Sequence, residues 1–247
     1  MQSSKKQFVL FAVAAALFAA LMITGVAGNV AHGNYTAIPI IFSALALVAF
    51  VVWFSIWFNR RRIRLMFQDP TPDRLIAHYH ATVLHAGPRR IPHSDAAAAY
   101  LSALAATIYG QFDRARQELD AIDWEQRPAM YRGHRAHILA VIALLEKQDE
   151  AEARRLAAEA RALEDTDPVG GMPILHSAIL VAIGDGEDDD VKRTQSAALG
   201  SSGAMPAICA WALSVHFGRA GDVMGATRYE GLLREVAPHF ACPLLHR

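Results

Sequence analysis

Hydrophobic residues dominate the first quarter of the chain, and charged residues are missing from it. The 53 residues between Lys6 and Arg60 include no Asp, Glu, Lys or Arg. A membrane-spanning helix needs about 20 apolar residues, so this run exceeds one span and accommodates two. Residues that form turns interrupt its middle: Gly28, Asn29, His32, Gly33, Asn34 and Pro39. We therefore predict a transmembrane hairpin within residues 1–64, with spans at about 8–27 and 38–58.

The basic residues that flank this run predict its orientation. Lys5 and Lys6 precede the first span, and Arg60, Arg61, Arg62 and Arg64 follow the second. Since basic flanks stay inside, we expect both termini in the cytoplasm. A cleaved signal peptide ending near Ala27 is the alternative, although its apolar run of about 20 residues exceeds the usual 7–15. Both alternatives leave the remainder of the chain cytoplasmic.

After Arg64 the hydrophobic pattern becomes that of amphipathic helices. Strand-like alternation of Val, Ile and Thr is missing, whereas Ala, Leu, Glu and Arg abound. Pro70 and Pro72 interrupt the chain before Asp73, which suits the start of a helix over 74–84. We predict a linker and lead-in helix over 65–94, helical pairs over 95–238 and a tail over 239–247, in an all-α fold.

A six-residue pattern recurs in this helical region. It appears as GQFDRA at 110–115, QDEAEA at 148–153 and GDVMGA at 221–226, with a weaker copy from Gly186. The successive spacings of 38, 38 and 35 residues are typical of a solenoid of helical hairpins. The first residue ends one helix in a left-handed conformation, the next residue begins another, and the Ala allows the two helices to cross closely.

The helix after each turn should carry one apolar face. The expected members are Phe112, Ala115, Leu119 and Ile122, then Ala153, Leu156, Ala157, Ala160 and Leu163, then Ala226, Tyr229, Leu233 and Val236. A single hairpin would leave such a face in water. Stacking of neighbouring hairpins buries it, which explains why the pattern recurs.

These hairpins resemble tetratricopeptide repeats. The last one matches best, with Gly221 and Asp222 at the turn, Ala226 at the crossing and Pro238 after the second helix. The first matches at Gly110, Phe112, Asp113 and Ala115, the second keeps Ala153 and Ala160 but has Gln148 in place of Gly, and the third has Val191 in place of Ala. The resemblance implies an α-solenoid that binds a protein or peptide partner.

In such stacks the first helix of each pair lines a concave groove. Counting back from each turn, the resemblance implies a partner-binding groove made of Tyr100, Ile138, His176 and Trp211, with Arg135 and Arg219 beside them. Aromatic residues and Arg often anchor partners. On this basis we expect Trp211→Ala to weaken partner capture without unfolding the protein.

The order of the chain, two spans followed by helical repeats, is similar to that of bacterial HemY-type inner-membrane proteins. From the apolar run and the repeats we expect a membrane-anchored adaptor or scaffold that is not an enzyme, placed in the bacterial inner membrane and in contact with lipid. The alternative is an accessory subunit of a membrane enzyme or transport complex, as in haem or envelope metabolism.

Charge and candidate chemistry narrow the function further. Residues 65–247 contain 18 basic and 24 acidic residues, a net charge of −6 that argues against a nucleic-acid partner. His134 and His137 have metal-ligand spacing but no accompanying motif, and the acidic run from Asp185 to Asp190 lacks the ligand spacing of a calcium loop. No phosphate loop or nucleophile motif is found. We predict no catalytic residues, no metal and no cofactor.

Overall fold

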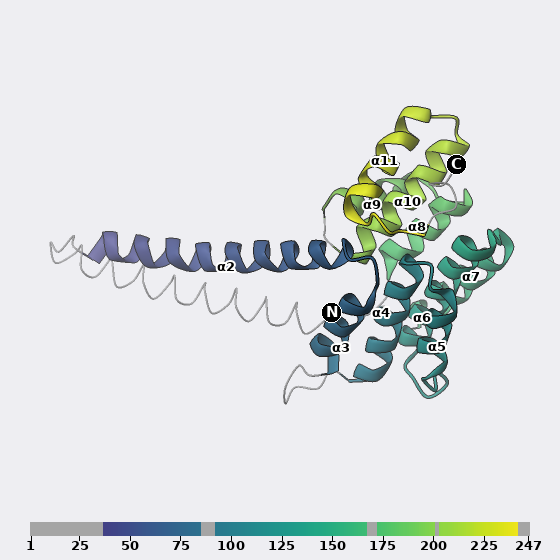
Figure 1. The fold of residues 1–247 in the computed structure, drawn as a ribbon, viewed down its shortest axis with the longest axis horizontal. Helices are drawn as coiled ribbons and strands as arrows, with labels where there is room; N and C mark the ends of the chain where they lie inside the picture. The colour runs from purple at the N-terminus through teal and green to yellow at the C-terminus, as the bar shows by residue number, and fades with distance from the viewer. Residues whose placement is uncertain (1–36, 85–91, 167–171, 201–202, 242–247) are drawn as a thin grey trace. The chain divides into compact units, whose positions relative to one another are not determined.

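The computed structural model describes residues 37–84, 92–166, 172–200 and 203–241, and all regular secondary structure within these ranges is helical (Figure 1). This confirms the predicted all-α class. The contacts divide the chain after Arg61 into two units, residues 1–61 and 62–247.

Helix α2 (Ala37–Phe67) has 31 residues and includes the second predicted span at 38–58, whereas the first predicted span at 8–27 lies outside the described residues. Large apolar side chains of α2 are exposed: Phe50, Val51, Trp53, Phe54, Ile56, Trp57 and Phe58. Within the part of the chain that the structure describes, no helix combines the length and the apolar character needed to cross a membrane.

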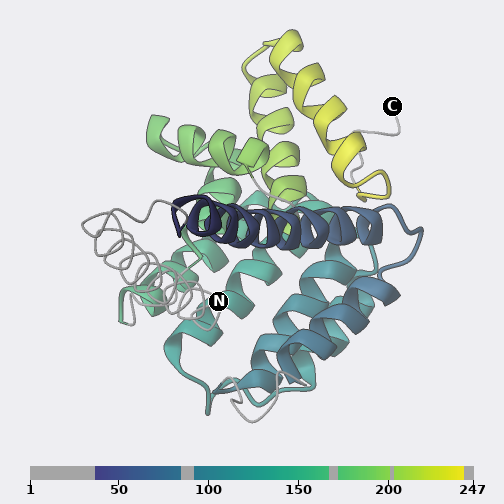
Figure 2. The same cartoon turned by 90° about the vertical axis from the view of Figure 1, so that its left-hand side faces the viewer.

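In the described residues of the unit that starts at Arg62, the end of α2 is followed by a lead-in helix and four helical pairs. The lead-in helix is α3 (Asp73–Leu84), and the pairs are α4 (Ser94–Ile108) with α5 (Phe112–Asp120), α6 (Ala129–Ile142) with α7 (Glu150–Asp165), α8 (Pro173–Ile183) with α9 (Asp188–Gly200), and α10 (Ala204–Arg219) with α11 (Val223–Val236). A π-helical turn, η1 (Ala143–Lys147), extends α6. Figure 2 shows the last pair, coloured green to yellow, as two helices joined by a tight turn.

In the turn that joins the two helices of each pair, one residue has a left-handed backbone conformation. These residues are Gly110, Gln148, Gly184 and Gly221, with φ values of 71°, 55°, 85° and 74°. Glycine adopts this conformation without steric cost, and Gln148 adopts it despite its side chain. After two of these turns, an aspartate caps the next helix: Asp149 accepts from the Glu152 N–H and Asp222 from the Gly225 N–H, at 2.9 Å each.

The third turn differs from the prediction. The left-handed residue is Gly184 and not Gly186, while α9 begins at Asp188, four residues after Gly184. In the other three pairs the second helix begins two residues after the left-handed residue. The third turn is thus two residues longer, and the predicted repeat from Gly186 matches the start of α9 but not the end of α8.

The second helices of the first, second and fourth pairs bury much, but not all, of the apolar faces that the sequence pattern predicted, since Phe112, Ile122, Leu163, Ala226 and Val236 are only partly buried. Ala115 and Leu119 of α5 and Leu233 of α11 are at most 1% exposed, and on α7 the buried residues are Ala153, Leu156, Ala157 and Ala160. Burial of these faces is the main stabilising contribution that stacking makes to the pairs.

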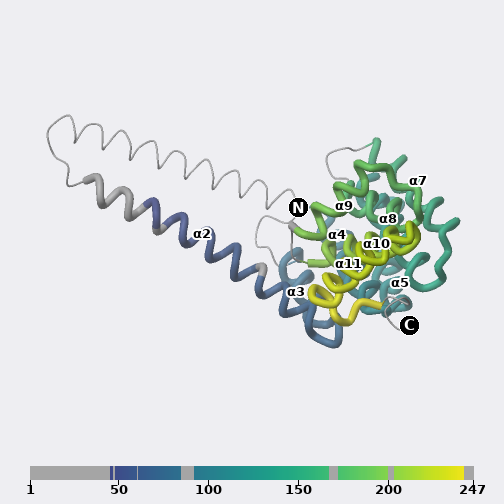
Figure 3. Tube along the Cα trace, turned by 90° about the horizontal axis from the view of Figure 1, so that it is seen from above, coloured from purple at the N-terminus to yellow at the C-terminus, as the bar shows by residue number. Residues whose placement is uncertain are grey.

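The first helices of the four pairs pack in a closed ring. Helix α4 contacts α6, α6 contacts α8, α8 contacts α10, and α10 contacts α4 again. The segment after α11, yellow in Figure 3, completes the closure: the Ala241 N–H donates to the Ile108 carbonyl at 2.8 Å, and the His239 ring stacks on Tyr109. The inner faces of these four helices therefore face one another.

Candidate partner-binding site

Three of the six residues expected in a groove are buried instead. Tyr100, Ile138 and Trp211 are 8%, 0% and 5% exposed. Tyr100 packs edge-on against His134, with ring centroids 4.9 Å apart, and Trp211 stacks on Phe240. The closed ring is the physical reason, because inward positions on the first helices meet other helices and not an open concave surface. For these residues the structure replaces the predicted groove position with a position in the core.

His176 and Arg219 also have partners inside the protein. His176 is half-buried, and its Nδ1 lies 3.1 Å from Nε2 of His137. Arg219 is exposed at the end of α10 and pairs with Glu150, the first residue of α7. These two side chains connect helices of different pairs, so both are engaged within the protein.

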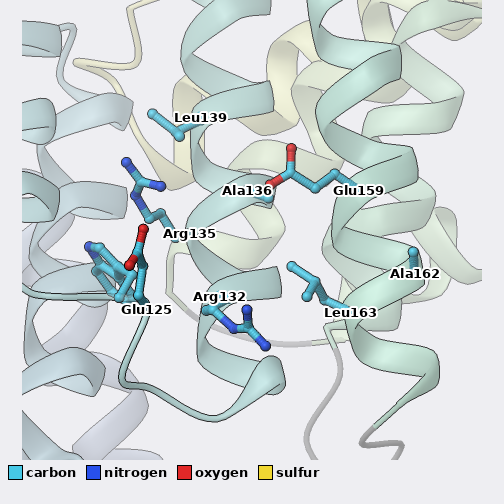
Figure 4. Close-up of a pocket in the computed structure, with 9 residues that line it drawn as sticks. Glu125, Arg132, Arg135, Ala136, Leu139, Glu159, Ala162 and Leu163 are labelled. Carbon is cyan, nitrogen blue, oxygen red and sulfur yellow. The ribbon is translucent and has the colours of Figure 1, made fainter.

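Arg135 is the predicted residue that lines a pocket. The pocket has a volume of about 360 Å³ and lies between α6, α7 and the segment that precedes α6 (Figure 4). Its lining residues are Trp124, Glu125, Arg132, Arg135, Ala136, Leu139, Glu159, Ala162 and Leu163. The spacing of Arg132 and Arg135 places both on one face of α6, where they are adjacent along the helix.

Several local features hold this pocket in shape. Trp124 is buried, and its indole N–H donates to the Leu119 carbonyl at 2.5 Å, which fixes the segment between α5 and α6. Pro128 precedes the first residue of α6, where the missing N–H of proline has no helical partner to lose. On the opposite wall, Leu163 belongs to the last two turns of α7.

The guanidinium groups of Arg132 and Arg135 are available to bind an anionic group in the pocket. In the described part of the chain neither Arg132 nor Arg135 forms an ion pair, and the buried Nε of Arg135 has no hydrogen-bond partner. Of the two carboxylates in the lining, Glu159 already accepts from Arg155 at 3.2 Å. A buried N–H without an acceptor is unfavourable, so an acceptor supplied from outside would stabilise the site.

A second polar cluster lies deep between α6, α7 and α8. His137 is fully buried, with its Nδ1 3.5 Å from Oε1 of Glu164 and its Nε2 facing His176, while Glu164 accepts from the Met172 N–H at 2.8 Å. Burial, together with the nearby His176 and His134, lowers the pKa of His137 to about 3. Burial also lowers the pKa of His176 and raises that of Glu164.

In this cluster one hydrogen bond between His137 and His176 connects α6 with α8, while Nδ1 of His137 has no hydrogen-bond partner among the described residues. The sequence shows the spacing of His134 and His137 but not their proximity to His176 and Glu164, because those residues come from other helices. Among the residues that the structure describes, no three His, Cys, Asp or Glu side chains converge in a way that could hold a metal ion.

Arg132 and Trp124 were not among the predicted site residues. The predicted residues are inward positions of the first helices, whereas this pocket lies at the side of one pair and includes the segment before it. The three-residue spacing of Arg132 and Arg135 was the available signal, since it places two cations on one helical face.

Comparison with known proteins identifies no relative of this chain. No protein-family model matches the chain, and no curated protein or solved structure is significantly similar to it.

Proposed function

We propose that this protein is a membrane-anchored adaptor whose helical pairs bind a segment of another protein on the cytoplasmic side of a membrane. The observation that carries the proposal is the pocket on α6 and α7, where two guanidinium groups without ion-pair partners lie beside apolar walls. The resemblance of the turns to tetratricopeptide repeats supports the same role.

The chemistry of the pocket specifies the kind of segment that it would bind. Arg side chains pair with carboxylates through two parallel hydrogen bonds, which favours an Asp, a Glu or a chain-terminal carboxylate. Trp124, Leu139 and Leu163 offer apolar contact for a neighbouring side chain of the same segment. A partner segment with a carboxylate next to an apolar residue therefore suits this site best.

Anchoring is supported by the charge pattern and by the exposed residues of α2. The uncharged run from residue 7 to residue 59 is long enough for two spans. Within α2 the rings of Phe50, Trp53, Phe54 and Trp57 contact one another in sequence and remain about half exposed. Aromatic side chains next to arginines are typical of the boundary between lipid and cytoplasm.

The adaptor role is tested by comparing the proteins that co-purify with three forms of the full chain in mild detergent. We expect a set of partners to be lost from the Arg132→Ala/Arg135→Ala variant. The same set should be retained by Arg228→Ala/Arg234→Ala, which removes two exposed basic residues from α11. Equal recovery of every partner by all three forms would contradict the proposed site.

The exposed aromatic residues of α2 also favour a second candidate, an accessory subunit that docks through its spans onto a membrane enzyme or transporter. Replacing residues 1–61 with an unrelated transmembrane hairpin distinguishes the two functions. An adaptor should keep its partners after the replacement, whereas a subunit that docks through its spans should lose them.

A further inference from the structure

A second hollow lies between residues 62–66, at the end of α2, and α3. It has a volume of about 500 Å³, and its lining residues are Arg62, Leu65, Met66, Arg74, Ala77, His78 and Ala81. All of them belong to the unit that starts at Arg62. Residues 62–67 at the end of α2 are held to this unit by Phe67, which is buried in the core, and by the Tyr109 hydroxyl, which donates to the Met66 carbonyl at 3.2 Å.

The lining of this hollow is cationic. Arg62 is exposed and forms no ion pair in the described part of the chain, and Arg74 shares its charge with Asp69 at 3.3 Å. No carboxylate belongs to the described lining. Burial lowers the pKa of the neighbouring His78 imidazole, and the positive charge of Arg62 lowers it further. An anion in the hollow would therefore meet the unpaired guanidinium of Arg62 and would share that of Arg74 with Asp69.

The remaining lining is apolar and open to the surroundings. Leu65, Ala77 and Ala81 are exposed, and Met66 is half-buried against the core. A free inorganic anion would gain nothing from these side chains. A molecule with a negative head and an apolar body would use both parts of the hollow, and an anionic phospholipid has that character.

The place of Arg62 along the chain supports the same ligand. It follows Phe58 by four residues within one continuous helix, directly after the aromatic residues of α2, and Arg60 and Arg61 precede it. If the uncharged run from residue 7 to residue 59 anchors the chain in a membrane, as the proposed function requires, Arg62 follows that run directly and lies at the level of the cytoplasmic headgroups. Basic residues at that level attract anionic lipids by about 1 kcal/mol each.

We propose that this hollow binds the phosphate of an anionic phospholipid of the cytoplasmic leaflet, with Arg62 and Arg74 as its ligands and the exposed apolar residues against the glycerol and upper acyl chains. This inference rests on the proposed membrane anchoring. It adds a site for one class of lipid to the proposed anchor.

The test uses the full chain reconstituted in nanodiscs of equal phosphatidylcholine and phosphatidylglycerol. The protein is then extracted in mild detergent, and the lipid that it retains is measured by mass spectrometry. We expect the retained lipid to be enriched in phosphatidylglycerol by about fivefold or more. The enrichment should fall in Arg62→Gln, disappear in Arg62→Gln/Arg74→Gln and persist in the control Arg228→Gln/Arg234→Gln.

The outcomes separate this inference from the anchoring on which it rests. If the chain enters nanodiscs but retains both lipids equally, the lipid site is wrong and the anchor stands. If the chain does not enter nanodiscs, the anchor fails and the lipid site fails with it. A third arm adds inorganic phosphate to lipid-free protein in detergent. Binding of phosphate that depends on Arg62, without phosphatidylglycerol enrichment, would also overturn the lipid as ligand.

Discussion

Gln148 shows how a single residue can depart from the repeat pattern and still keep its geometry. It has the same left-handed conformation as the three glycines at the other turns. For a residue with a side chain this conformation costs about 1–2 kcal/mol. The π-helical turn that precedes Gln148 brings the Asp149 N–H to the Ala143 carbonyl at 3.1 Å, so the surrounding hydrogen bonds maintain the strained residue.

We expect Gln148→Gly to stabilise the protein. The glycine removes the steric conflict at φ 55° and should raise the free energy of unfolding by about 0.5–1 kcal/mol, after its own entropic penalty. The matched control is Gln111→Gly, because Gln111 has φ −85° and gains nothing from glycine. Urea denaturation measures both. A lower free energy of unfolding in Gln148→Gly would mean that contacts of the Gln148 side chain stabilise the protein by more than the backbone strain destabilises it.

Trp211 requires a different prediction from the one that its sequence position suggested. Because it is buried and stacks on Phe240, Trp211→Ala should destabilise the protein by about 3–5 kcal/mol. Any loss of partner capture would then follow from unfolding. Thermal unfolding of the purified chain checks this expectation. An unchanged melting temperature would contradict the buried position of Trp211.

At the scale of the helices, the cluster of His137, His176 and Glu164 makes the junction of α6, α7 and α8 sensitive to acid. His137 stays neutral in the folded protein down to about pH 3 but titrates near 6.5 when unfolded. Between these values the unfolded chain binds a proton that the folded chain does not. His176 shifts in the same direction, whereas the raised pKa of Glu164 offsets part of the effect at the acidic end.

The free energy of unfolding should therefore decrease as the pH falls below about 6.5, by ~1.4 kcal/mol per pH unit for each histidine that stays neutral in the folded state. Denaturant titrations at several pH values measure this slope. His137→Gln keeps a polar partner for His176 but removes one titrating group, so its slope should be smaller. An identical slope in the variant would exclude His137 as a source of the acid sensitivity.

The sequence predicted the helical pairs better than it predicted how they assemble. Local signals at Gly110, Gly221 and the apolar faces of α5, α7 and α11 specify the turns and the buried sides, because each depends on residues close in the chain. The contact between α10 and α4 joins residues about a hundred positions apart, and no local pattern encodes it. Arg135 was identified as a site residue, but for a groove that the closed ring eliminates.

At the scale of the whole unit, closure of the ring depends on a close approach at Gly110. A Cβ atom on this residue would lie 2.7 Å from the Cβ atom of Ala241, whereas Gly221, with nearly the same φ, has open space around its position. Both Gly→Ala variants should introduce the same backbone strain. Only Gly110→Ala should also disturb the packing of Ala241 against the end of α4.

We therefore expect Gly110→Ala to reduce the free energy of unfolding more than Gly221→Ala does, by about 1–3 kcal/mol, the range for overpacked sites. Hydrogen exchange should show the extra loss at the Ala241 amide, which bonds to Ile108. Equal destabilisation by both variants would mean that the segment after α11 moves aside without a penalty.

The contact of α10 with α4 also bears on how the described pairs unfold. In an open array each unit touches only its neighbours in the chain, and the units can unfold one after another. Here the last described pair also contacts the first, so a pair that unfolds at either end removes contacts from two others. The described pairs should therefore melt together in one cooperative step.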